Sequence, residues 1–109
     1  MKLIGEIIRE KREEKGWLLR HLAAELDIDQ AVLSKIERRE RKASKEQIQK
    51  FATVLGLKKD ELMLQFLSEN IAYDIVGEKK ALDVLHAAEA KIDYLRKQKK
   101  KNNGSTFGK

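Results

Sequence analysis

Six basic side chains within eleven residues form the most concentrated chemical feature of this sequence, and only two glutamates oppose them. Guanidinium and ammonium groups gathered in this way bind phosphate, because they donate hydrogen bonds to its oxygens and neutralise its charge. The alternative interpretation is an ordinary solvated loop. The side chains concerned are Lys35, Arg38, Arg39, Arg41, Lys42 and Lys45.

The net charge of +6 is distributed unevenly along the 109 residues. Residues 1–66 carry 15 basic and 12 acidic side chains, residues 67–95 carry 3 basic and 6 acidic ones, and residues 96–109 add six basic and no acidic ones. The excess of positive charge therefore lies largely in the last 14 residues. For this reason the local basic run, rather than the overall charge, indicates a nucleic-acid partner.

Residues suited to catalysis or metal binding are scarce. The absence of cysteine excludes a disulfide scaffold, a thiolate metal site and a cysteine nucleophile. His21 and His86 are too few and too far apart for a metal site, and Ser34 and Lys35 are neighbours that point about 100° apart on a helix. No glycine-rich phosphate loop is present. We therefore expect neither an enzyme nor a cofactor or small-molecule ligand.

The sequence contains no segment typical of membrane insertion or secretion. No apolar run approaches the roughly 18 residues that a membrane helix needs, and the N-terminal stretch becomes charged too early for a secretory signal. We therefore expect a cytoplasmic protein with no membrane partner. The chain length allows one domain with an appended element.

Apolar residues recur with helical spacing along almost the whole chain, which predicts an all-α protein without a sheet. Asp29 and the pair Ser44–Gln47 have the types and spacing of residues that cap helix N-termini. Gly16 and Gly56 are placed to end helices. The six helices are expected at about residues 3–16, 19–26, 30–38, 45–55, 59–73 and 78–97.

The last predicted helix has an apolar stripe of its own, with successive spacings of 4, 3, 4 and 3 that are typical of a coiled-coil seam. The stripe either packs on the fifth helix of the same chain or pairs with another molecule. We favour an intermolecular contact, because the first five helices already close a core within residues 1–66. This plan leaves residues 67–98 as a helical dimerisation extension and 99–109 as a disordered basic and polar tail. The expected interface residues are Leu62, Phe66, Ile71, Leu85, Ala88, Ile92 and Leu95.

Residues 19–38 have the pattern of two short helices that cross steeply at a tight turn. Ala23 is small enough for the close approach, and Asp27 tolerates the positive φ that the turn requires. Apolar side chains for the crossing are supplied by Leu22, Leu26, Ile28, Leu33 and Ile36. Together these residues fill most positions of a helix-turn-helix.

The sequence resembles the Cro/C1-type (XRE, phage-repressor-like) helix-turn-helix family over roughly residues 3–66, on the stretches IREKREEKGW, LAAELDID, LSKIERRERKAS and FATVLGLKKDEL. The resemblance implies a five-helix repressor-like domain, here with a long C-terminal dimerisation helix, and a function in transcription regulation. It also implies that the third helix enters the major groove of double-stranded DNA. In addition, the stretch ENIAYDI and the heptad-like last helix resemble small regulators that accompany restriction–modification genes.

The resemblance assigns roles to individual residues of this chain. Arg12 and Glu37 are expected to form a structural ion pair that ties the first helix to the third. The basic run from Arg38 to Lys45, together with Arg20 and His21, is expected to bind DNA phosphates. The side chains expected to face base edges are Gln30, Ala31, Val32, Ser34 and Lys35.

The sequence departs from the family pattern in three places, one of which is a pair of residues. Asp27 and Arg39 stand where the family usually has glycine. Leu18 and Leu19 replace a Ser-Gln pair whose glutamine reaches a phosphate, which removes one expected anchor to the DNA backbone.

A single recognition helix contacts few base pairs, so we expect a homodimer on a palindromic operator. The rival hypothesis is an antitoxin-like or adaptor protein whose last helix binds another protein.

Overall fold

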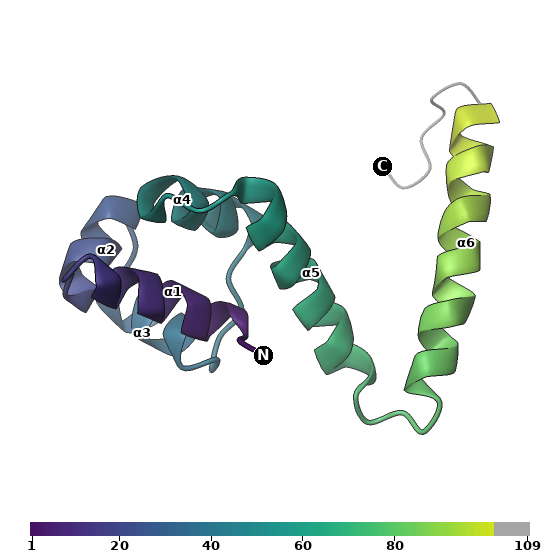
Figure 1. Ribbon diagram of the computed structural model, residues 1–109, viewed down its shortest axis with the longest axis horizontal. Helices are drawn as coiled ribbons and strands as arrows, with labels where there is room; N and C mark the ends of the chain where they lie inside the picture. The colour runs from purple at the N-terminus through teal and green to yellow at the C-terminus, as the bar shows by residue number, and fades with distance from the viewer. Residues whose placement is uncertain (102–109) are drawn as a thin grey trace. The chain divides into compact units, whose positions relative to one another are not determined.

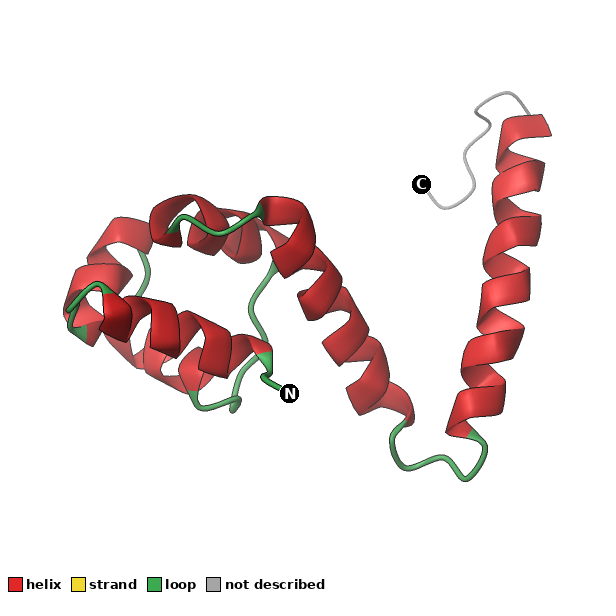
Figure 2. Cartoon of the chain, viewed as in Figure 1, coloured by secondary structure: helices red, strands yellow, loops and turns green. Residues whose placement is uncertain are grey.

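The computed structural model describes residues 1–101, and residues 102–109, most of the expected disordered tail, lie outside this range. The described chain is all-α, as predicted, with six helices and no strand (Figures 1 and 2). None of its helices is long and apolar enough to cross a membrane. The helices are α1 (Ile4–Glu14), α2 (Leu19–Leu26), α3 (Gln30–Glu37), α4 (Lys45–Leu55), α5 (Lys59–Ile75) and α6 (Ala81–Lys101).

The helix ends follow local signals in the sequence. The carboxylate of Asp29 accepts a hydrogen bond from the backbone N–H of Ala31 at 3.2 Å and caps α3. Ser44 and Gln47 form the predicted capping box at the start of α4, with both bonds between 2.9 and 3.1 Å. Gly56 ends α4 in the left-handed region, at φ 71°.

The ends of the last two helices differ from the prediction. α5 continues to Ile75, since no glycine interrupts it before Gly77. α6 begins at Ala81 instead of residue 78, because Glu78 belongs to the preceding turn and its N–H donates to the carbonyl of Ile75 at 2.9 Å. α6 also extends to Lys101, so residues 99–101, predicted as part of a disordered tail, are helical. Lysines there are good helix formers and complement the negative end of the helix dipole.

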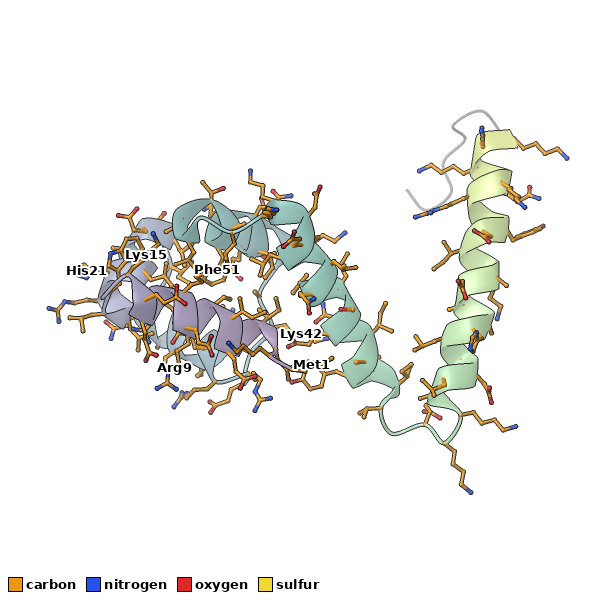
Figure 3. All side chains as sticks on the ribbon, in the orientation of Figure 1. Met1, Arg9, Lys15, His21, Lys42 and Phe51 are labelled. Carbon is orange, nitrogen blue, oxygen red and sulfur yellow. The ribbon has the colours of Figure 1, made fainter. Side chains whose placement is uncertain are left out.

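The chain divides into two compact units, the first spanning Met1–Tyr73 and the second beginning at Asp74. The first unit contains the hydrophobic core, which draws residues from α1 to α5, and Phe51 lies between these helices (Figure 3). α6 belongs to the second unit and contains no buried residue. The division falls inside α5, later than the boundary after residue 66 that the sequence suggested.

Two of the expected interface residues are core residues. Leu62 and Phe66 were predicted to be exposed and to hold two copies together, but they are only 4% and 7% exposed within the first unit. They lie one turn apart on the face of α5 that packs against the core, so this part of α5 completes the first unit. The prediction for these two residues was therefore wrong.

Candidate nucleic-acid interface

The turn between α2 and α3 has the predicted helix-turn-helix geometry. Asp27 adopts a left-handed backbone, with φ 56° and ψ 48°. The N–H of Ile28 donates to the carbonyl of Ala23 at 3.0 Å, and the N–H of Asp27 donates to that of Ala24 at 3.2 Å. These bonds satisfy carbonyls at the end of α2, and the buried methyl group of Ala23 lets the two helices pack closely.

The helix α3 presents one face to the core and the other to solvent. Leu33 and Ile36 point inward and are buried. Gln30, Ala31 and Lys35 are exposed on the side away from the core, with Ala31 and Lys35 one turn apart and Gln30 beside Ala31 in the first turn. This face offers an amide, a methyl group and an ammonium group in a row.

The two remaining residues expected to face the bases are less accessible. Ser34 is half-buried, on the edge of the exposed face. Val32 is half-buried and packs against the hydrophobic core. Ala31 is therefore the exposed apolar side chain on α3.

The loop between α3 and α4 holds Arg39 in a left-handed conformation, with φ 63°. The N–H of Arg39 donates to the carbonyl of Ile36 at 3.1 Å, and the N–H of Glu40 donates to that of Lys35 at 2.8 Å. This pair of bonds is a Schellman motif, which glycine usually ends because a β-carbon is unfavourable at positive φ. Arginine is less favourable than glycine in this backbone conformation. We therefore attribute the arginine at this position to its charged side chain.

The cations of this loop are exposed, and most of them have no acidic partner. Arg38 pairs with Glu40 at 3.3 Å. Within residues 1–101, no carboxylate forms a salt bridge with the remaining cations, whose positive charge is therefore available to an external anion. These cations are Lys35, Arg39, Arg41, Lys42 and Lys45.

At the start of α2, the structure shows the roles of the two leucines that replace the Ser-Gln pair of the family pattern. Leu19 packs against the core, and Leu18 stands at the N-cap position without a side-chain cap. Leu19 therefore contributes to packing where the family pattern has a polar contact to DNA. Arg20 and His21 are exposed in the first turn, and His21 points outward from the first unit (Figure 3).

The expected ion pair between α1 and α3 is present in the structure. Arg12 Nε lies 2.8 Å from Glu37 Oε2, and Arg12 Nη2 lies 3.0 Å from Glu37 Oε1. Both residues are buried, and Arg12 Nη1 also donates to the carbonyl of Trp17 at 2.7 Å. The hydrogen bond to Glu37 raises the pKa of the Arg12 guanidinium above its ordinary value. This bidentate contact fixes the end of the recognition helix relative to α1.

Two further residues that position α1 against its neighbouring helices were missed in the sequence. A β-carbon on Gly5 would lie 2.5 Å from the carbonyl oxygen of Glu37 and 2.7 Å from that of Ile36, so only glycine permits this contact between α1 and α3. Glu69 Oε1 on α5 accepts a hydrogen bond from the N–H of Ile4 at 2.7 Å, at the start of α1. The glycine at position 5, inside a predicted helix, was a signal for the close approach of α1 to α3. No local pattern in the sequence indicates the hydrogen bond between Glu69 and Ile4.

Groups that could hold a metal ion are not found within residues 1–101, where no cluster of three or more His, Cys, Asp or Glu side chains has suitable placement. The polar surface of the first unit is instead the exposed face of α3 with the cationic loop that follows it. This combination fits a nucleic acid, which has base edges to read and phosphates to bind.

Comparisons with known proteins agree with this geometry. A sequence profile described as helix-turn-helix matches residues 8–62, which is half of the chain. The chain is also similar to one in the solved structure of a SinR protein/SinI protein complex, with 25% sequence identity, a TM-score of 0.51, and coverage of 90% of this chain and 99% of that one. No curated protein sequence matches the chain. The chain belongs to the Cro/C1-type helix-turn-helix family, whose members are DNA-binding transcription regulators and not enzymes.

Proposed function

We propose that this protein is a sequence-specific repressor that binds a palindromic operator in double-stranded DNA as a homodimer. The observation that carries the proposal is the exposed face of α3 beside a loop whose cations have few acidic partners. DNA binding is assigned to residues 1–66 and dimerisation to residues 67–98, with α6 continuing through residues 99–101.

Base recognition is assigned to α3 in the major groove. The exposed amide of Gln30 is suited to a bidentate contact with adenine, and the ammonium of Lys35 to the O6 and N7 atoms of guanine. Ala31 supplies a methyl contact for thymine, with Ser34 and Val32 at the edge of this surface. Each good base contact contributes about 1–3 kcal/mol of discrimination.

Phosphate binding is assigned to the residues that flank α3. Their contacts are independent of sequence, so they position the helix without selecting bases. Backbone N–H groups at the starts of α2 and α4 add to these contacts. The side chains concerned are Arg20, His21, Arg38, Arg39, Arg41, Lys42 and Lys45.

Dimerisation is assigned to the apolar stripe of α6, together with Ile71 of α5. Ile71, Leu85, Ile92 and Leu95 are all exposed large apolar side chains. Covering them by a second copy removes apolar surface from water. A palindromic operator requires two recognition helices about 34 Å apart, one for each half-site, and a dimer supplies two.

The experiment is footprinting on the DNA upstream of the protein's own gene and of adjacent genes. The resemblance to regulators that accompany restriction–modification genes directs the search there. We expect one protected palindrome with wild-type protein, and loss of protection with Lys35→Ala. Lys58→Ala, which removes an exposed lysine immediately before α5 and outside this surface, is the matched control. Protection of no specific site by the wild-type protein contradicts the proposal.

A second candidate function is that of an antitoxin-like or adaptor protein whose α6 binds a different protein. It is favoured by the similarity to a solved complex of two proteins, which extends over 90% of this chain. Light scattering on the purified chain separates the two functions. A dimer supports the repressor, whereas a monomer with α6 uncovered supports the adaptor.

A further inference from the structure

We propose that the two copies of α6 pair antiparallel, so that the N-terminal half of one helix lies beside the C-terminal half of the other. This inference rests on the proposed homodimer and specifies its geometry. It concerns α6 alone, independently of how the two units of one chain are placed.

The exposed apolar stripe is continuous along α6. Leu85, Ile92 and Leu95 are 42%, 50% and 42% exposed, and Ala88 lies between them in the same stripe. Spacings of four and three residues keep this stripe on one side over the 21 residues of the helix. A second copy offers the same stripe and can cover it in either orientation.

Charge selects between the orientations. Residues 81–90 contain two acidic side chains, Asp83 and Glu89, and no lysine or arginine. Residues 91–101 contain six basic side chains and one acidic one. A parallel pair places the two basic halves side by side, whereas an antiparallel pair places each basic half beside an acidic one. None of the salt bridges within residues 1–101 involves α6, so no described carboxylate neutralises its cations.

The residues that flank the stripe give the same answer. With Leu85 and Ile92 at positions a of the heptad, Lys91 falls at g and Arg96 at the following e. In a parallel pair these two positions face each other across the interface, which brings like charges together twice. In an antiparallel pair each edge meets the same edge of the other helix, so Lys91 and Glu89 each lie near their own copy. Arg96 then shares its edge with Glu89 of the other copy, once on each side of the pair, and the parallel pair lacks this attraction. The helix dipoles also oppose each other favourably in this arrangement.

The absence of cysteine makes single-cysteine crosslinking of the full-length chain a direct test. Positions 85 and 95 lie ten residues apart, about 15 Å along the helix, which exceeds the roughly 7 Å between Cα atoms that a disulfide spans. The Leu85→Cys and Leu95→Cys proteins are first oxidised separately. They are then oxidised as a mixture, with the two proteins made in different sizes so that the mixed disulfide can be told apart from the self-disulfides. We expect the mixed disulfide to form at least about ten times faster than either self-disulfide. Ala90→Cys, on an exposed position outside the stripe, gives the background rate.

Ala88→Cys separates the inference from the proposed function on which it rests. In a parallel pair this position meets its own copy, whereas in the antiparallel pair it faces Ile92 of the second copy. The self-disulfide of Ala88→Cys and its mixed disulfide with Ile92→Cys therefore report dimerisation through α6 in either orientation. Efficient Ala88→Cys crosslinking, with self-disulfides at 85 and 95 at least as fast as the mixed one, overturns the antiparallel orientation but leaves the homodimer. If neither the Ala88→Cys self-disulfide nor its mixed disulfide with Ile92→Cys forms faster than the Ala90→Cys background, and light scattering gives a monomeric mass, the homodimer itself is overturned.

Salt dependence provides an independent readout in the wild-type protein. Screening weakens an antiparallel pair, because it reduces attraction between opposite charges, and it strengthens a parallel pair by reducing repulsion. We expect the dissociation constant of the dimer to rise several-fold between about 0.05 and about 0.5 M NaCl. A dissociation constant that falls over this range contradicts the antiparallel orientation.

Discussion

The first unit and α6 carry apolar residues at the same helical spacing but bury them to very different extents. Ile8, Leu22 and Leu33 of the first unit are fully buried, whereas α6 has no buried residue. Helical periodicity shows that a helix has an apolar face, but it does not show which surface covers that face. The first unit supplies the cover from its own helices. We propose that the stripe of α6 is covered by another molecule, and the following experiments test this difference between the two regions.

Leu85→Glu combined with Ile92→Glu should have the largest effect, and it acts on assembly. Two carboxylates in the stripe cannot be buried without a large cost in free energy, so we expect a folded monomer. Operator affinity should fall by at least about 10³, since specific binding exceeds non-specific binding by that factor or more. Light scattering at micromolar concentration and gel shifts on the operator measure both effects.

The matched control adds the same two charges outside the stripe, as Ala87→Glu with Ala90→Glu. Both alanines are exposed, so this variant should stay dimeric and bind DNA. The first unit should melt at the same temperature in all three proteins, because its core lies elsewhere. A stripe mutant that still dimerises and binds the operator would remove α6 from the interface.

Glu37→Ala should have the next largest effect, and it acts within the first unit. The variant leaves the buried guanidinium of Arg12 without its partner, and we expect a loss of about 3–5 kcal/mol in the free energy of unfolding. Replacing both residues, as Arg12→Met with Glu37→Leu, should cost less, because no charge is then stranded. Urea denaturation of the two variants measures the difference, and a double variant less stable than Glu37→Ala contradicts a coupled pair.

The pH dependence of this pair follows from the direction of the pKa shift. The pKa of Arg12 is raised in the folded protein, so its contribution to stability is fully present below the ordinary arginine pKa. It is lost only as the pH rises through the raised value. The cost of Glu37→Ala should therefore be similar at about pH 6 and about pH 9.

The parts of the fold that the sequence predicted correctly depend on signals within a few residues. Asp29 caps α3 through an N–H two residues away, and Ser44 and Gln47 cap α4 within three. The positive φ of Asp27 likewise follows from its place in a short turn. Such contacts depend on residue type and spacing, which the sequence displays directly.

The parts that were missed depend on partners far along the chain. Glu69 accepts its hydrogen bond from a residue 65 positions away, and the close approach at Gly5 involves the distant end of α3. The burial of Leu62 and Phe66 was misjudged for the same reason. The sequence shows that α5 has an apolar face, but the burial of that face depends on how α1 to α4 pack.

Gln30→Ala and Lys35→Ala test whether the exposed face of α3 reads bases. Each should weaken operator binding by about 1–3 kcal/mol and leave binding to random DNA nearly unchanged. Fluorescence anisotropy with both DNAs measures the two affinities. Equal losses on operator and random DNA would show that these side chains do not select bases.

Arg39→Gly should have the smallest effect, with opposite signs for stability and DNA binding. Glycine removes the cost of a β-carbon at φ 63°, so we expect unfolding to become about 1 kcal/mol less favourable. The loss of one phosphate contact should weaken binding to operator and random DNA equally. The slope of log affinity against log salt should then decrease by about 0.9. Urea denaturation and salt titrations of binding measure these effects.

Two controls separate backbone strain from charge at this loop. Arg39→Lys keeps both the positive φ and the charge, so it should leave stability and the salt slope close to those of the wild type. Asp27→Gly relieves the corresponding strain at the end of α2 without removing a cation, so it should stabilise the protein and leave the salt slope unchanged. If Arg39→Gly stabilises the protein and its salt slope also stays that of the wild type, Arg39 does not contact phosphate. The strained arginine would then have no role in DNA binding, and the remaining cations of the loop would account for the phosphate contacts.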